Sequence, residues 1–338
     1  MKKINVIIFL FLFAFNPINM DVYAEESKSA EFRGDNLFIN FVDDKLKQRF
    51  YQYDTNTKKN KILFKKEITD YPTATYSSSN KEVYFTNKTK NQTSQLFKQN
   101  LNNSQTKQLT NQFNNVDLLE LDEENQLLFM RVLIGDNERN FQLAIYDLKN
   151  KKINKWNNQD KDTSVFMMDY NPKKKQLLLV TNSVKKEYEK IEQANKKGIP
   201  PEPPVYTLSI YNKDGQKVKD IKTIEVFLTG ASLSSDGNNI LISYFNNPKE
   251  HTFSIATIDM KSKNTTLLLK DPTVSMRQPE YNKDKSGFYF LADKNKQINI
   301  NDENVNEVTI NFYEIKNKII SKTWFCKNGQ VVNFYVDK

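Results

Sequence analysis

A phrase that recurs six times along the chain constrains its fold more than any other feature. Each copy is an apolar segment that ends in an acidic or amide residue, followed by a polar turn and a second segment. A short polar side chain at the end of a strand can bond to its own backbone and start a turn. The pattern therefore predicts strand pairs at near-regular intervals. The end residues are spaced 46, 47, 65, 47 and 55 positions apart and are Asp54, Asn100, Asp147, Asn212, Asp259 and Glu314.

A second phrase precedes the first in five of the units. It is an aromatic or aliphatic residue, six mostly polar residues and then an apolar segment, as in YSSSNKEV (76–83) and LSSDGNNI (233–240). Extended segments joined by a turn rich in Ser, Asn, Asp and Lys predict a β-hairpin. Segments such as LLFMRV, LLLVT and ILISYF are nearly continuous apolar runs. Such runs are typical of strands that are covered on both faces.

The repeat predicts an all-β fold built from about four short strands per unit. In a self-repeating chain the neighbouring units are the natural cover for both faces of each sheet. Four-stranded sheets repeated radially form a β-propeller, and six units predict six blades. A β-sandwich or two stacked barrels would not require six copies of one phrase. No unit shows the sustained 3.6-residue period of a helical repeat.

Two segments resemble a known superfamily. LSSDGNNILIS (233–243) resembles the Ser-Pro-Asp-Gly hairpin of TolB-like six-bladed β-propellers, and LFKQNLNNSQTKQLTN (96–111) resembles their strand pair that ends in Gln-Leu-Thr. The resemblance covers roughly residues 32–336 as a degenerate repeat, in which only the 233–243 copy keeps the Asp-Gly pair. Such propellers are interaction scaffolds in some proteins and enzyme domains in others, so this resemblance alone does not assign a function.

The two ends of the chain carry separate signals. Lys2 and Lys3 precede an apolar run from Ile4 to Phe15. Val22 and Ala24 are small or short residues at positions −3 and −1 before Glu25, as at a cleavage site. This order predicts a secretory signal peptide over 1–24. The mature protein would then be secreted or associated with the cell envelope, and residues 25–338 would form one propeller domain. An uncleaved membrane anchor is the alternative, but the run is short for a span. The segment 325–336 is a candidate strand to complete the first blade and close the ring; a seventh, incomplete blade is the weaker option.

Two irregular segments interrupt the repeat. Residues 184–205 form an insertion with Val184, Tyr188 and Ile191 at helical spacing, a stop at Gly198 and a Pro-rich return. We expect a helix in the loop between the second and third strands of blade four, as a partner-docking element or a solvated decoration. Residues 293–302 carry mixed charge and are predicted to be a loop.

Composition limits the classes of partner. The formal charge of +9 becomes +8 without residues 1–24, which would favour anionic partners, although dispersed lysines also serve solubility. No nucleic-acid-binding module is recognisable, and no membrane span remains after signal cleavage. The partner is therefore expected to be a protein or an anionic wall polymer, and the protein to be a monomer. Cys326 is the only cysteine, so no internal disulfide is possible.

Known catalytic and metal-binding motifs are not recognisable. His251 is the only histidine, and it has no partner pattern around it. The residues of NKDKSGFYFLAD (282–293) match some positions of a calcium loop, but the segment already reads as a hairpin. We therefore expect no cofactor and no metal, and a non-enzymatic role is favoured over an extracellular hydrolase or lyase that uses carboxylates at the channel.

The resemblance to TolB-like propellers implies a ligand site at the mouth of the central channel. The starts of the innermost strands and the loops between second and third strands would line that mouth. Arginines there could bind a carboxylate or phosphate in a forked geometry. The residues nominated in this way are Tyr71, Asp117, Arg131, Tyr188, Arg277 and Gln278.

Overall fold

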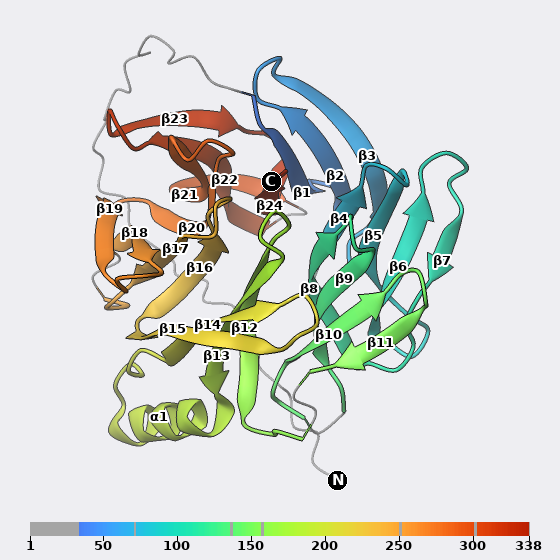
Figure 1. The fold of residues 1–338 in the computed structure, drawn as a ribbon. Coiled ribbons are helices and arrows are strands. Elements are labelled where there is room, and N and C mark those ends of the chain that lie inside the picture. The colour runs from blue at the N-terminus through green and yellow to red at the C-terminus, as the bar shows by residue number, and fades with distance from the viewer. Residues whose placement is uncertain are drawn as a thin grey trace. The chain divides into compact units, whose positions relative to one another are not determined.

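The computed structural model describes residues 34–337 except 71, 136–137, 157–158, 250–251 and 301–302. Within these ranges the chain folds into six antiparallel sheets of four strands, arranged around a centre as a six-bladed β-propeller (Figure 1). The predicted fold class and blade number are confirmed. The predicted signal peptide, 1–24, and His251 lie outside the described residues.

The strands of each blade follow one another from the centre of the ring outward. Blades one to three are β24 (Gly329–Val336), β1 (Asn36–Asp43), β2 (Lys47–Asp54) and β3 (Lys59–Glu67); β4 (Ala74–Ser77), β5 (Glu82–Lys88), β6 (Ser94–Asn100) and β7 (Thr106–Gln108); and β8 (Asn115–Asp122), β9 (Leu127–Leu133), β10 (Gln142–Asp147) and β11 (Lys152–Lys155). Blades four to six are β12 (Thr163–Asn171), β13 (Gln176–Ser183), β14 (Val205–Asn212) and β15 (Lys217–Glu225); β16 (Phe227–Leu233), β17 (Asn239–Phe245), β18 (Phe253–Asp259) and β19 (Thr265–Asp271); and β20 (Ser275–Tyr281), β21 (Gly287–Ile300), β22 (Glu303–Glu314) and β23 (Ile319–Trp324).

The first blade is assembled from both ends of the described chain. β24 pairs with β1 in antiparallel register, with Leu37 opposite Val336 and Asp43 opposite Gly329. Figure 1 shows β24 beside β1 at the centre of the ring. Joining the last strand to the first blade closes the ring and covers the inner edge of β1, and β24 takes the innermost position of the blade.

The two repeated phrases have simple structural meanings. Each residue at the start of the second phrase is the cross-strand partner of the residue seven positions later, as for Tyr76 and Val83 or Leu233 and Ile240. Each end residue of the first phrase closes the third strand of a blade. The carboxylate of Asp54, for example, accepts hydrogen bonds from the backbone N–H groups of the turn that follows, at 2.9 Å.

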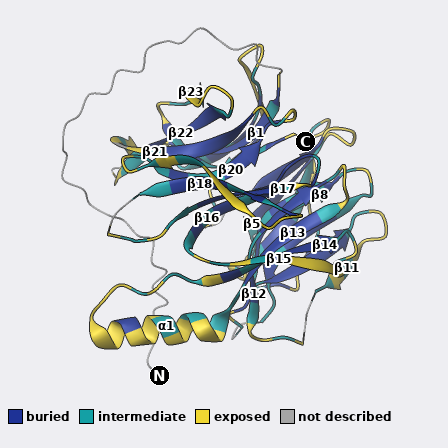
Figure 2. Cartoon of the chain, turned by 60° about the vertical axis from the view of Figure 1, so that its left-hand side comes forward, coloured by how far each residue is buried: buried dark blue, intermediate teal, exposed yellow. Residues whose placement is uncertain are grey.

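The continuous apolar runs are explained by burial on both faces. In β13, Leu177 and Leu179 pack in a cluster with blade three, whereas Leu178 and Val180 pack in a cluster with blade five. Successive residues of a strand point to opposite faces, so an inner strand between two neighbours needs apolar residues at every position. Figure 2 shows this burial concentrated in the inner strands.

The prediction of a loop at 293–302 is wrong for residues 293–300. β21 continues to Ile300 and pairs with β22, with Asp293 opposite Val308 and Ile300 opposite Glu303. Apolar and polar residues alternate only over 298–300, where Ile300 is buried. The polar residues before them extend the ladder with β22, so backbone pairing makes a strand where the sequence carries only mixed charge.

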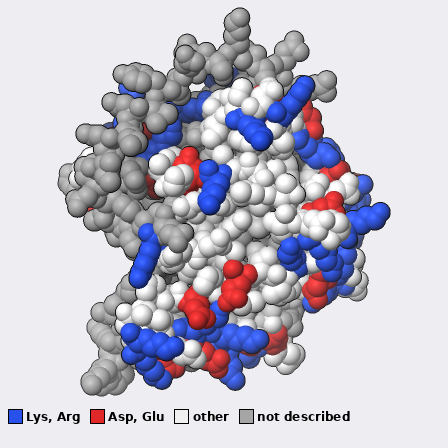
Figure 3. Space-filling model, turned by 90° about the vertical axis from the view of Figure 1, so that its left-hand side faces the viewer, with Lys and Arg blue, Asp and Glu red and all other residues white. Residues whose placement is uncertain are grey.

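Lysines lie along the outer strands of the blades. Within the described residues, each outermost strand (β3, β7, β11, β15, β19 and β23) contains at least one lysine. Lysine on an edge strand opposes edge-to-edge pairing with another chain. On the face shown in Figure 3, basic and acidic side chains are interspersed. Each blade therefore carries positive charge at its outer edge.

Gly230 provides a test of how closely the inner strands approach. A Cβ atom at Gly230 of β16 would lie 2.5 Å from the backbone nitrogen of Gln278 in β20. We predict that Gly230→Ala lowers the free energy of unfolding by about 1–3 kcal/mol, because the strands must move apart. At Gly135 the nearest atom is a Glu138 side-chain carbon at 3.4 Å, so Gly135→Ala should stay within about 0.5 kcal/mol of wild type. Equal losses in urea denaturation would contradict this packing.

Lys66 is a half-buried lysine on β3, and its Nζ donates to Asn87 Oδ1 at 3.2 Å. Burial lowers its pKa from 10.5 to about 8. Between these values the unfolded chain binds more protons than the native one, so this group makes stability rise as pH increases from about 8 to 10.5. We predict that Lys66→Met removes this rise in melts across that range, whereas Lys59→Met, at an exposed position of the same strand, keeps it. An unchanged pH profile in Lys66→Met would refute the assignment.

Candidate functional site

Asp117 and Arg131 form an ion pair on the inner strands of blade three. They are cross-strand partners on β8 and β9, with Arg131 Nε 2.6 Å from Asp117 Oδ1 and Nη2 2.8 Å from Oδ2. The remaining terminal nitrogen, Nη1, donates to the backbone carbonyl of Phe166 in blade four at 2.5 Å. The guanidinium also lies over the Phe141 ring, 4.6 Å from its centroid. This arginine therefore joins two blades.

Arg277 and Gln278 make the corresponding connection from blade six to blade one. Arg277 donates to the carbonyls of Val332 at 3.1 Å and Val331 at 3.4 Å. The Gln278 side chain donates to the carbonyl of Phe334 at 2.5 Å. All three acceptors lie on β24, the strand that closes the ring. These two side chains hold the closing strand against its neighbour.

Acidic residues near Arg277 do not converge on one point. Burial raises the pKa of Asp293, and burial lowers the pKa of Arg277. Asp293 lies opposite Val308, whereas Glu307 lies opposite Lys294. Adjacent positions of a strand face opposite ways, so the two carboxylates project from opposite faces of the β21–β22 hairpin. Among the described residues, no group of three or more His, Cys, Asp or Glu side chains is placed to hold a metal ion.

The residues nominated from the sequence thus belong to separate places. Asp117 and Arg131 lie in blade three, and Arg277 and Gln278 lie in blade six, on opposite sides of the ring. Tyr188 lies on the insertion, 47% exposed, with the Arg139 guanidinium 4.7 Å from its ring centroid. Tyr71 lies outside the described residues.

The insertion forms the helix α1 (Val184–Lys197), between the second and third strands of blade four as predicted. Its N-terminal cap is Ser183, whose hydroxyl accepts from the Lys186 N–H at 3.1 Å. Asp162 accepts from the Lys185 N–H and the Ser183 hydroxyl, both at 2.7 Å. Gly198 ends the helix in the left-handed conformation, with φ 63°. The first turn therefore already has acidic and hydroxyl partners from the protein itself.

The helix packs on the blade by a different side from the one that its apolar spacing suggested. Ala194 is the buried residue of α1. Tyr188 and Ile191 are exposed to 47% and 39%. Figure 2 shows most of the helix surface exposed. An apolar helical stripe usually faces the core. In this protein it remains available at the surface.

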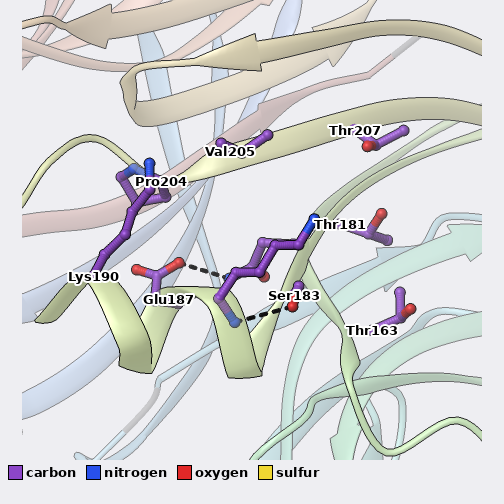
Figure 4. A pocket seen from close by; sticks show the side chains of 10 residues that line it. Thr163, Thr181, Ser183, Glu187, Lys190, Pro204, Val205 and Thr207 are labelled. Atoms are coloured by element: carbon purple, nitrogen blue, oxygen red, sulfur yellow. Dashed lines mark hydrogen bonds between the residues drawn. The ribbon is translucent and has the colours of Figure 1, made fainter. Parts of the chain in front are cut away.

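A cavity of about 240 Å³ lies between α1 and the strands of blade four (Figure 4). The β13–β14 ladder ends at the pair Thr181 and Thr207, and the two strands separate beyond it to accommodate α1. The strands contribute three threonines to the lining and the helix contributes three charged residues. They are Thr163, Thr181, Thr207, Lys186, Glu187 and Lys190.

The charged groups of the cavity are partly engaged. Asn182 Nδ2 donates to Glu187 Oε2 at 2.9 Å. Lys190 Nζ donates to the Pro203 carbonyl and to Glu225 Oε1, both at 2.6 Å. Lysine and glutamate of the same helix thus bring both signs of charge to one side of the cavity. The arrangement provides donors and acceptors, and no catalytic triad or metal-binding group accompanies it among the described residues.

The threonines of this cavity are not among the residues predicted from the sequence. They come from three strands separated by up to 44 positions, and nothing in their local sequence marks them. One signal was available, because Thr181 and Thr207 flank the predicted insertion on both sides. Because strands that flank an insertion must separate at its base, the residues at that point are candidates to line a cavity.

Comparisons with known proteins support the fold. No family model matches the chain. Over 316 residues the chain is 27% identical to the uncharacterized protein YdjN of Bacillus subtilis, covering 90% of this chain and 87% of that protein. The crystal structure of TolB from Acinetobacter baumannii matches with a TM-score of 0.59 and 12% identity over 91% of this chain and 67% of that one. A chain of the nidogen/laminin complex matches with a TM-score of 0.57 and 9% identity, over 90% and 98% of the respective chains. The protein has the fold of TolB-like six-bladed β-propellers.

The Asp117–Arg131 pair generates a stability prediction. The side chains are 7% and 19% exposed, so removing the arginine leaves a largely buried carboxylate without its partner. We expect Arg131→Met to cost about 3 kcal/mol in chemical denaturation. The double variant Asp117→Leu/Arg131→Met should recover part of that loss. Arg139→Met removes only a surface cation–π contact and should cost less than about 1 kcal/mol; a similar cost for both arginines would contradict the structural role of Arg131.

Proposed function

We propose that this protein is an exported, non-enzymatic propeller that binds a protein partner through the exposed side of α1. One observation carries the proposal. Of the ten large apolar side chains that are exposed in the described part of the chain, three lie on α1 or directly after its C-terminal cap. These residues, Tyr188, Ile191 and Ile199, are 47%, 39% and 53% exposed and form the α1 patch. Exposed apolar groups that gather on one element are typical of interaction surfaces.

The geometry of the channel mouth favours this location over the channel. Arg131, Arg277 and Gln278 already donate to carbonyls of the neighbouring blades. A hydrolase or lyase that uses channel carboxylates, the alternative function, requires acids that act on one bond. Asp117 is ion-paired and Asp293 and Glu307 face opposite ways.

The distribution of charge favours a protein over an anionic polymer as the partner. A polymer of repeating negative charge is best matched by a continuous basic surface. Lysines occur instead on the outermost strand of every blade in the described chain, and the five lysines of α1 are interspersed with three glutamates. On the face shown in Figure 3 they alternate with carboxylates. The nidogen/laminin structure shows that a chain of this fold occurs in a protein complex.

Export is the part of the proposal that rests on the sequence alone. The basic start, the apolar run and the small residues before Glu25 support a signal peptide that ends at Ala24. Within the described residues, no helix has the length and apolar character needed to cross a membrane.

N-terminal sequencing of the protein recovered from culture medium and cell envelope should give Glu25 as the first residue; an intact N-terminus in the membrane fraction would contradict export by cleavage.

The α1 patch generates a binding prediction. Tyr188→Ala/Ile191→Ala should weaken sedimentation of the purified protein with cell walls from its own organism by at least tenfold, because two exposed apolar contacts are lost. Alanine keeps the helix intact. Leu267→Ala, at a 53% exposed position on β19, should leave sedimentation unchanged and is the matched control.

Protease treatment of the walls separates the two classes of partner. If the partner is a protein, digestion of the walls abolishes sedimentation, and binding depends weakly on salt. If the partner is an anionic polymer, binding survives digestion and falls steeply as ionic strength rises. Binding that survives protease would therefore overturn the proposed protein partner.

A further inference from the structure

The cavity beneath α1 contains hydroxyl groups that the fold does not use. No hydrogen bond from the hydroxyl of Thr163, Thr181 or Thr207 occurs within the described part of the chain, although Thr181 is only 9% exposed. Figure 4 shows these threonines on the strands of blade four, across the cavity from the side chains of α1. These hydroxyls therefore keep their donor and acceptor capacity free for a ligand in the cavity.

The threonines are regularly placed. Thr181 and Thr207 are direct cross-strand partners, and Thr163 lies two residues before the partner of Thr181 on the same face of the sheet. Directly opposed side chains on neighbouring strands have Cβ atoms roughly 5 Å apart. Thr181 and Thr207 therefore present two adjacent hydroxyls at the spacing of the sheet, and Thr163 adds a third from a diagonal position; each hydroxyl can donate and accept.

The charges around the cavity disfavour ionic ligands. Lys186 and Lys190 would repel a metal or organic cation, whereas Glu187 opposes an anion and Lys190 already donates to Glu225 and to the Pro203 carbonyl. An apolar ligand would leave the threonine hydroxyls without partners. A neutral ligand with many hydroxyls can bond to the threonines and to the remaining capacity of the charged groups, because a hydroxyl accepts from lysine and donates to glutamate.

The size of the cavity further limits the class of ligand that it can bind. About 240 Å³ is smaller than the roughly 300–1,000 Å³ typical of pockets for drug-sized ligands. Pro204 and Val205 add an apolar wall beside the polar floor (Figure 4). A saccharide ring has hydroxyls at its edge and C–H groups on its faces, which matches this combination.

We propose that the cavity between α1 and blade four binds one neutral saccharide unit through Thr163, Thr181 and Thr207. This goes beyond the proposed protein partner, because the cavity lies between the helix and the strands and does not include the α1 patch. The geometry provides no aromatic platform in the lining, so binding to a single sugar should be weak, on the order of millimolar.

The test is ligand-observed saturation-transfer NMR on the purified full-length protein, with glucose and N-acetylglucosamine as the probes and alanine as a zwitterionic comparison. We expect saturation transfer to at least one of the two sugars and none to alanine. Thr181→Val/Thr207→Val, which removes two hydroxyls and keeps the β-branched shape, should weaken sugar binding at least tenfold, since each lost hydrogen bond is worth about a factor of five. Thr207→Val alone should weaken it about fivefold and covers the case in which the double variant fails to fold.

Thr223→Val is the matched control. Thr223 lies opposite Thr207 on β15 and is exposed outside the cavity, so its replacement should change sugar affinity by less than twofold. Tyr188→Ala/Ile191→Ala should also leave sugar binding unchanged, which separates this site from the α1 patch. Absence of transfer to both sugars in large excess over the protein, binding of alanine in their place, or equal affinity in Thr207→Val and Thr223→Val would overturn the proposal.

Discussion

The hydrogen bonds that join each inner strand to the next blade are the interaction on which the rest of the structure depends. A blade has apolar residues on both faces of its sheet, so it is stable only when both neighbours are present, and the ring must be closed. Closure by β24 gives the first blade its inner strand. Side chains on the first to third strands of each blade then hold successive blades to one another. They donate to the carbonyls of Ala74, Val116, Phe166, Ser234, Met276 and Val332.

This constraint explains why the channel mouth is a poor place for a ligand in this protein. Arg131 and Arg277 have the chemistry of anion-binding residues, yet their guanidinium groups are occupied by backbone carbonyls and, for Arg131, by Asp117. A ligand that took these donors would compete with the contacts that hold the ring together. The loops between second and third strands do not have to hold neighbouring blades together. The longest of them contains α1, and both the exposed apolar patch and the cavity belong to it.

The sequence predicts the blades well because each blade repeats the same physical requirements. A polar residue such as Asp54 must close the third strand, and paired residues such as Tyr76 and Val83 must flank a hairpin turn. The site is harder to predict for a different reason. The partners of Arg277 are backbone carbonyls, which no residue type reveals, and the cavity is formed by threonines brought together from three strands. The extension of β21 over 293–300 is missed because its mostly polar residues give little periodic signal, although they pair with β22.

Site-specific photo-crosslinking in culture tests the central claim most directly, namely that partners meet α1 and not the channel. A photoreactive phenylalanine analogue would replace Tyr188 in one variant and Arg277 in another. The account predicts a protein adduct of defined mass from position 188 that is lost when Ile191→Ala is added, and no adduct from position 277. An adduct from position 277 with none from position 188 would contradict the claim that partners bind at α1, and would indicate that they bind at the channel mouth.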